Sequence, residues 1–79
     1  MIKIAKVVLY SKNDCIQCRM TKRNLDSLGI EYQEINLDEN PQFLEYVTKD
    51  LGFMAAPVVE TDTDAWSGFQ TGKIKAIKR

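Results

Sequence analysis

The feature that most restricts the fold of this chain is a pair of cysteines, Cys15 and Cys18, placed between an apolar run and a helix-forming stretch. The apolar run covers residues 4–10, and four polar residues that do not extend a strand follow it. Residues three apart in a helix are neighbours on one face, so the two sulfur atoms come within bonding distance, with Cys15 at the helix start. In a chain with a strand–helix–strand pattern, this arrangement predicts a dithiol–disulfide redox pair.

The first half of the chain alternates strand and helix signals. Residues 4–10 predict a buried strand, residues 16–28 a helix, and residues 31–37 a second strand. The helix carries one apolar stripe that faces a core, formed by Cys18, Thr21, Leu25 and Leu28. Gly29 follows this stripe and predicts the end of the helix, because glycine is the usual C-terminal cap.

A second helix is predicted after the second strand. Asn40 is expected to cap it, Pro41 to occupy its first position, and Gly52 to end it. Its apolar face is expected to consist of Phe43, Leu44, Val47 and Leu51.

Two strands and a helix complete the chain. Residues 57–61 predict a third strand, and a polar turn leads to a short fourth strand around residues 65–66. The last helix is expected over Thr71 to Lys78, with Ile74 and Ile77 buried.

The order β-α-β-α-β-β-α predicts an α/β fold with one domain over residues 1–79. Strands joined by a helical crossover are parallel and the connection is right-handed, whereas strands joined by a tight turn are antiparallel. We therefore expect a four-stranded mixed sheet flanked by three helices on its two faces. The cysteines then lie at the carboxyl end of a central strand, where open α/β sheets usually place their chemistry.

Composition excludes several other classes of function. The 79 residues hold 11 Lys and Arg against 11 Asp and Glu, a balance that argues against nucleic acid as a partner. No apolar stretch approaches the roughly 20 residues that a membrane span needs, and Met1-Ile2-Lys3-Ile4 lacks the layout of a signal peptide. Two closely spaced cysteines are not a secreted disulfide framework, so we expect a cytoplasmic, monomeric protein. With no histidine, a zinc site would need carboxylates or a second chain, and we expect no metal.

The two cysteines are expected to have different roles. Cys15 stands at a helix N-terminus, where unpaired N–H groups and the helix dipole favour an anion, so its pKa should be moderately lowered. Lys12 and Arg19 add positive potential, and Asp14 opposes it. Cys18 belongs to the core stripe and should be shielded. We therefore expect Cys15 to attack a partner's disulfide and Cys18 to resolve the mixed disulfide. Two merely structural buried thiols are the plainer alternative.

Three further segments are candidates for partner binding. The backbone before Ala56-Pro57 is expected beside the cysteines, where it can pair with an extended partner segment. The segment Trp66-Ser67-Gly68-Phe69 flanks the same end of the sheet. With Ile16 and Met20, which lie off the core stripe, its aromatic side chains would form an apolar collar that recognises a protein. The alternative for Trp66 and Phe69 is burial in the core.

At these residues the chain resembles the NrdH-redoxins, the glutaredoxin-like electron donors of ribonucleotide reductase. The resemblance covers nearly the whole length and is carried by Tyr10–Cys18, Thr21–Arg23, Pro57–Val59 and Trp66–Phe69. It implies a thioredoxin fold, a cis peptide bond before Pro57 and no cofactor other than the cysteine pair. It further implies reduction by an NADPH-dependent thioredoxin reductase and delivery of electrons to class Ib ribonucleotide reductase.

Glutathione-dependent glutaredoxins differ at two of these places. They carry an aromatic residue where this chain has Ile16-Gln17, and a Gly-Gly-acidic segment that binds glutathione where it has Trp66-Ser67-Gly68-Phe69. Lys12 resembles the lysine that they use against a glutathione carboxylate, so a glutaredoxin is one alternative. A redox-sensing binding module and an iron–sulfur carrier using Cys15 of two chains are others. NrdH-redoxins usually continue with Arg and Pro where this chain has Gln70 and Thr71. If an arginine there ties down the loop, this chain must hold the loop otherwise, with an effect on recognition of the reductase.

Overall fold

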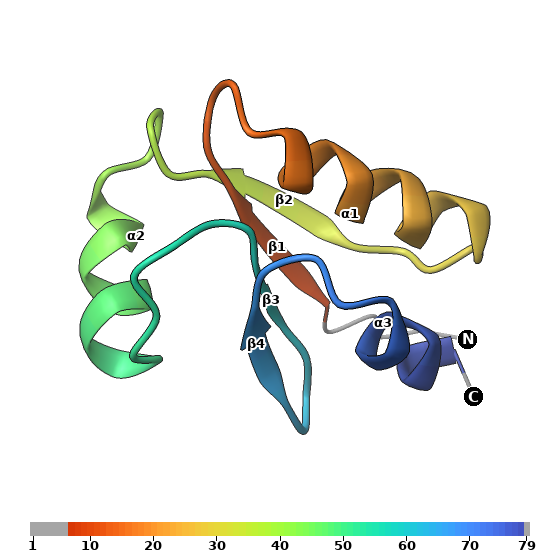
Figure 1. Ribbon diagram of the computed structural model, residues 1–79. Coiled ribbons are helices and arrows are strands. Elements are labelled where there is room, and N and C mark those ends of the chain that lie inside the picture. The colour runs from red at the N-terminus through yellow and green to blue at the C-terminus, as the bar shows by residue number, and fades with distance from the viewer. Residues whose placement is uncertain (1–6, 79) are drawn as a thin grey trace, which may run out of the picture.

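The computed structural model of the chain describes residues 7–78 (Figure 1). The elements, in chain order, are β1 (Val8–Ser11), α1 (Ile16–Ser27), β2 (Gln33–Asn36), α2 (Gln42–Glu45), a π-helical segment η1 (Tyr46–Asp50), β3 (Val58–Glu60), β4 (Ala65–Ser67) and α3 (Thr71–Lys78). The predicted order of strands and helices is confirmed, and the bounds predicted for α3 match those observed.

The four strands form one mixed sheet in the order β2-β1-β3-β4. β1 pairs with β2 in parallel and with β3 antiparallel, and β3 pairs with β4 antiparallel, as predicted. The carboxyl ends of β1 and β2 therefore meet at one edge of the sheet. The turn that carries the cysteines leaves the sheet at this edge.

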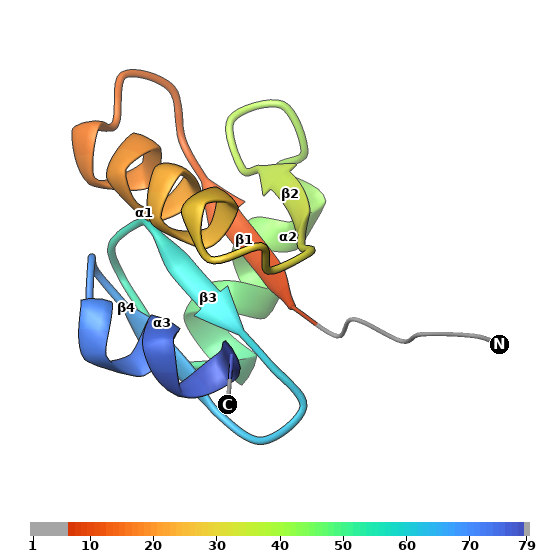
Figure 2. The same ribbon diagram turned by 90° about the vertical axis from the view of Figure 1, so that its right-hand side faces the viewer.

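Helices cover both faces of the sheet (Figures 1 and 2). Successive residues of a strand point to opposite faces, so Leu9 and Tyr10 of β1 belong to different core clusters. The α1/α3 cluster contains Val7, Leu9, Leu25, Ile30, Val59, Trp66 and Ile74. The α2/η1 cluster contains Tyr10, Leu37, Val47 and Val58.

The observed bounds of the first three strands and the first helix differ slightly from the predicted ones. Residues 4–6 of the first predicted strand lie outside the described residues, and β1 ends one residue later than predicted, at Ser11. α1 ends at Ser27, and Gly29 follows with a φ of 72°, which confirms it as the stop signal. β2 and β3 are shorter than the patterns at 31–37 and 57–61 predicted.

The prediction for the second helix is wrong in two respects. No side chain caps α2, because Pro41 occupies the cap position and Asn40 donates its amide Nδ2 to the carbonyl of Asn36. Leu44 is 44% exposed instead of buried. The helix widens into η1, where Leu51 N–H donates to the carbonyl of Tyr46, and a π-helical turn rotates later residues away from α-helical spacing.

Candidate active site

The two cysteines form a disulfide at the N-terminus of α1, with Cα atoms 5.2 Å apart. Cys15 is the N-cap residue of the helix, and its Sγ accepts a hydrogen bond from Cys18 N–H at 3.1 Å. The same N–H would stabilise a thiolate on Cys15 after reduction. Cys18 is only 2% exposed, whereas Cys15 is half-buried. The expected contrast between an accessible and a sheltered sulfur is present.

The turn between β1 and α1 is held by the neighbouring turn after β2. Asp14 has a φ of 52°, a left-handed conformation that Asp adopts more easily than most residues. Asp38 accepts from the Lys12 ammonium at 2.7 Å and from Asn13 N–H at 2.8 Å. These two donors lower the pKa of Asp38. Asn36 donates from Nδ2 to Asn13 Oδ1.

Sequence reasoning missed Asp38 and Asn36 as supports of the redox turn. The available signal is that both follow β2, whose carboxyl end adjoins that of β1 in a parallel pair. The ion pair with Asp38 also weakens the prediction that Lys12 binds a ligand carboxylate, because the Lys12 charge is already partly neutralised.

A polar pocket of about 220 Å³ lies beside the disulfide and is lined by residues of the redox turn, α1 and β2. On its floor the buried Ser11 hydroxyl donates to Glu34 Oε2 at 2.7 Å, and Lys22 donates to the same oxygen at 3.2 Å. The Glu34 carboxylate thus links β1, β2 and α1 below the cysteines.

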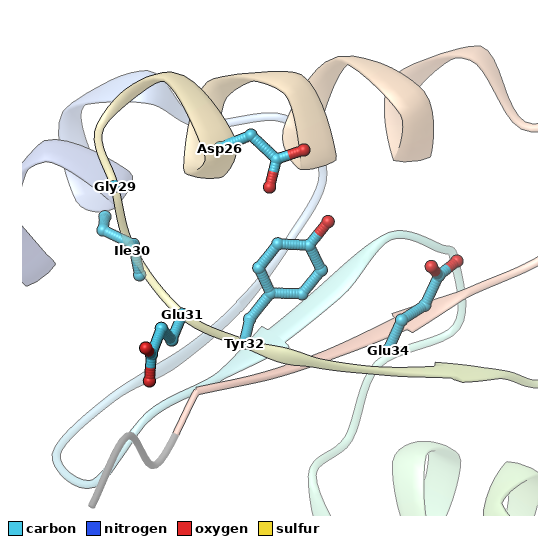
Figure 3. A pocket seen from close by; sticks show the side chains of 6 residues that line it. All are labelled: Asp26, Gly29, Ile30, Glu31, Tyr32 and Glu34. Carbon is cyan, nitrogen blue, oxygen red and sulfur yellow. The ribbon is translucent and has the colours of Figure 1, made fainter. Parts of the chain in front are cut away.

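A second, more open pocket of about 690 Å³ lies near the C-terminal end of α1 (Figure 3). Its acidic wall is formed by Asp26, Glu31 and Glu34, and the Tyr32 ring lies between Asp26 and Glu34. Burial, followed by the charges of Asp26 and Glu34, raises the pKa of Tyr32. The pocket contains neither cysteine nor any of the predicted partner-binding residues.

The segment around Pro57 packs against the loop after β4. The Ala56–Pro57 peptide bond is cis, which confirms what the resemblance implied. Gly68 N–H donates to the Pro57 carbonyl at 2.7 Å, and the Ser67 hydroxyl donates to the Ala55 carbonyl at 2.9 Å. Pro57 itself is buried.

The expected apolar collar is only partly formed. Ile16 is 66% exposed and Met20 42% exposed, and Phe69 is half-buried. Trp66 is 4% exposed and belongs to the α1/α3 cluster, so its indole takes the core position that was the alternative. Met54, three residues before Pro57, is 88% exposed and was missed, because nothing in a single loop methionine distinguishes a surface position from a core one.

Two glutamines join the loop after β4 to its surroundings. Gln17, between the cysteines, accepts from Phe69 N–H through its Oε1 at 3.3 Å. Gln70 donates from Nε2 to the Ser67 carbonyl at 2.8 Å. Neither contact was predicted: the first joins residues 52 apart in the sequence, and the second is a local bond, three residues apart, that depends on the conformation of the loop.

Within residues 7–78 no group of three or more His, Cys, Asp or Glu side chains is arranged to hold a metal ion. None of the described helices combines the length and the apolar character that a membrane crossing requires.

A cysteine pair at a helix N-terminus, with one sulfur accessible and the other sheltered, on this sheet topology, defines a thiol–disulfide oxidoreductase of the thioredoxin fold. The chain belongs to the glutaredoxin family, which it matches over residues 7–66.

Individual relatives give a finer position within that family. The chain is 47% identical over 71 residues to the glutaredoxin-like protein NrdH of Lactococcus lactis subsp. cremoris, with 90% of this chain and 97% of that protein covered. It is 35% identical over 72 residues to the protein of the same name from Escherichia coli, with 91% and 88% covered. The solved structure of NrdH-redoxin from Escherichia coli, described as having a thioredoxin-like activity profile, aligns with a TM-score of 0.83 at 36% identity, covering 89% of this chain and 91% of that one. The resemblance stated from the sequence is confirmed.

Proposed function

We propose that this chain is an electron carrier that reduces disulfides of other proteins, with ribonucleotide reductase as its electron acceptor and thioredoxin reductase as its electron source. It works as a cytoplasmic monomer, and its own cysteine pair is its only redox group.

The observation that carries this proposal is the unequal exposure of the two cysteines, since Cys18 is 2% exposed and Cys15 is half-buried. In the reduced protein the Cys15 thiolate attacks one sulfur of the partner's disulfide, and the partner's other sulfur leaves as a thiolate. Cys18 then loses its proton and attacks Cys15, which restores the Cys15–Cys18 disulfide and releases the partner as a dithiol. Two electrons pass to the partner in each cycle, and thioredoxin reductase must supply two electrons to reduce the Cys15–Cys18 disulfide again.

The uncharged segments that carry the predicted partner-binding residues favour a protein over glutathione as the partner, whereas the charged side chains near the cysteines line the polar pocket. The segments 16–17, 53–59 and 65–72 contain no charged side chain. Glutathione is an anion with two carboxylates, and an uncharged surface offers them no ion pair. Lys12, the one residue that resembles a glutathione contact, is paired with Asp38 at 2.7 Å.

The choice of ribonucleotide reductase rests on the relatives and on the motifs they share. The curated relatives at 47% and 35% identity carry the name NrdH, and the resemblance through Trp66–Phe69 points in the same direction.

Consumption of NADPH tests the proposal. The oxidised protein should be reduced rapidly by NADPH and thioredoxin reductase, and slowly by glutathione with glutathione reductase. The reduced protein should then support turnover of a class Ib ribonucleotide reductase, with the Cys15→Ser variant as the inactive control. Equal or faster reduction by the glutathione system would favour a glutaredoxin instead.

A further inference from the structure

The loop Ser67–Gln70, which begins with the last residue of β4, is tied at its start to the segment before β3. Gly68 has a φ of 90°, a conformation that residues with a Cβ rarely adopt. Its N–H reaches the Pro57 carbonyl, and the Ser67 hydroxyl reaches the Ala55 carbonyl. These two bonds tie the start of the loop to the segment before β3.

The end of the loop is held by the side chains of two glutamines. Phe69 N–H donates to Gln17 Oε1 at 3.3 Å, across a separation of 52 residues in the sequence. The same oxygen lies 3.9 Å from the position that a Cβ on Gly68 would occupy, so the Gln17 side chain lies beside Gly68 as well as Phe69. Gln70 Nε2 closes the loop on itself through the Ser67 carbonyl at 2.8 Å.

These bonds connect three segments: the start of α1, which carries the disulfide, the segment before β3, and the loop Ser67–Gln70. The exposed apolar side chains of Ile16 and Met54 belong to two of them. Gln17 is the link to α1, and it lies between the two cysteines.

We propose that Gln17 and Gln70 are positioning residues that fix the loop Ser67–Gln70 as part of the surface on which an uncharged, extended segment of a disulfide-bearing protein docks. This inference rests on the proposed function, in that it takes the partner's disulfide to be carried by a protein. A small disulfide needs only the sulfur of Cys15 and gains nothing from an ordered loop. A protein segment touches the loop, and it loses affinity when the loop must be ordered during binding.

Four variants separate this role from a general effect on the protein. Gln17→Met keeps the size of the side chain and removes the acceptor, whereas Gln17→Glu keeps an acceptor oxygen. Gln70→Met removes the donor to Ser67. Gln42→Met, at the exposed first position of α2, is the matched control.

Hydrogen exchange of the Phe69 amide, measured by NMR, tests the contact itself. We expect about fivefold faster exchange in Gln17→Met, the change that loss of one ordinary hydrogen bond produces, and near-normal exchange in Gln17→Glu and Gln42→Met. Unchanged exchange in Gln17→Met would overturn the assignment of Gln17.

Single-turnover rates of the pre-reduced protein test the consequence. The rate with the disulfides of insulin should fall about fivefold in Gln17→Met and Gln70→Met, while the rate with the small disulfide 5,5′-dithiobis(2-nitrobenzoate) changes less than about twofold. A parallel fall with both disulfides would mean that the glutamines act on the cysteines, and an unchanged insulin rate would mean that the loop does not dock. Both results overturn the proposal. Neither assay contains thioredoxin reductase, so the proposed electron source can fail without affecting this result.

Discussion

At the level of single residues, replacing each cysteine in turn tests the two proposed roles most directly. Cys15→Ser should abolish reduction of protein disulfides, because the accessible sulfur is lost. Cys18→Ser should retain the first attack and accumulate a mixed disulfide, because the buried resolving sulfur, 2% exposed in the native protein, is missing. Mass spectrometry under non-reducing conditions, after mixing each reduced variant with oxidised insulin, measures the adduct. Adduct formation by Cys15→Ser alone would reverse the two roles.

Asp38 gives a second prediction, about the charge beside Cys15. Its carboxylate pairs with Lys12 and also accepts from Asn13 N–H. Asp38→Asn keeps an acceptor for that N–H but leaves the Lys12 charge unbalanced. The thiolate fraction of Cys15 in the reduced variant should therefore rise at neutral pH, because a nearby unbalanced cation favours the anion.

The ultraviolet absorbance of the thiolate during a pH titration measures this change, and Lys12→Ala should shift the curve in the opposite direction. The difference between the variants should shrink in high salt, since Lys12 and Asp38 are 45% and 32% exposed. A titration that moves higher in Asp38→Asn would show that the carboxylate acts on the shape of the turn and not through its charge.

How far single residues could be predicted depended on whether their role is local. Cys15, Cys18 and Gly29 lie where the sequence predicted, because their positions follow from spacing along one helix. Trp66 could belong to the core or to the surface, since a three-residue strand does not reveal which of its faces is covered. The structure buries it.

At the scale of elements, the contact of Glu60 with two tyrosines on the α2/η1 face predicts how stability depends on pH. Glu60 of β3 accepts hydrogen bonds from Tyr10 of β1 and from Tyr46 of η1. The bond to Glu60, followed by burial, raises the pKa of Tyr46 to about 12, and burial with the Glu60 charge raises the pKa of Tyr10 further. A tyrosine in the unfolded chain titrates near 10. The neutral phenols thus stabilise the fold fully below about pH 10, and this stabilisation is lost as the pH rises from about 10 towards 12.

Urea unfolding at a series of pH values from 8 to about 11 tests this sign. The free energy of unfolding should fall above about pH 10, and the fall should be shallower in Tyr46→Phe, which cannot ionise. A variant with the same slope as the native protein would show that other groups cause the alkaline loss of stability.

The order and pairing of the elements could be predicted from local patterns and connection rules. The form of the second helix could not. Its widening into η1 and the exposure of Leu44 arise from how the segment packs against the sheet. A prediction based on α-helical spacing does not include a π-helical turn. The same limit applies to the redox turn. The bond between Asn13 and Asp38 spans 25 residues and exists only after β1 and β2 have paired.

Considered as a whole, the molecule has two core clusters that share one sheet. Leu9 and Tyr10 are adjacent in β1 but pack on opposite faces of the sheet. Each cluster therefore loses buried contacts if the strands separate. In a chain of 79 residues, neither cluster alone buries enough apolar surface to be stable. The two faces should therefore unfold together.

Truncations on the two faces test this coupling. Ile74→Ala in the α1/α3 cluster and Leu37→Ala in the α2/η1 cluster should each lower the free energy of unfolding by about 2–5 kcal/mol, because both side chains are buried. Leu44→Ala, at a position 44% exposed, is the control and should cost less than about 1 kcal/mol. In each variant the fluorescence of Trp66 reports on the first face and the methyl NMR signals of Val47 on the second. Coincident urea transitions for the two probes are expected, since a two-state domain melts as one unit. If Ile74→Ala moved the Trp66 transition and left the Val47 transition in place, the faces would be separate folding units, and the sheet between them would not be the common support of the redox site.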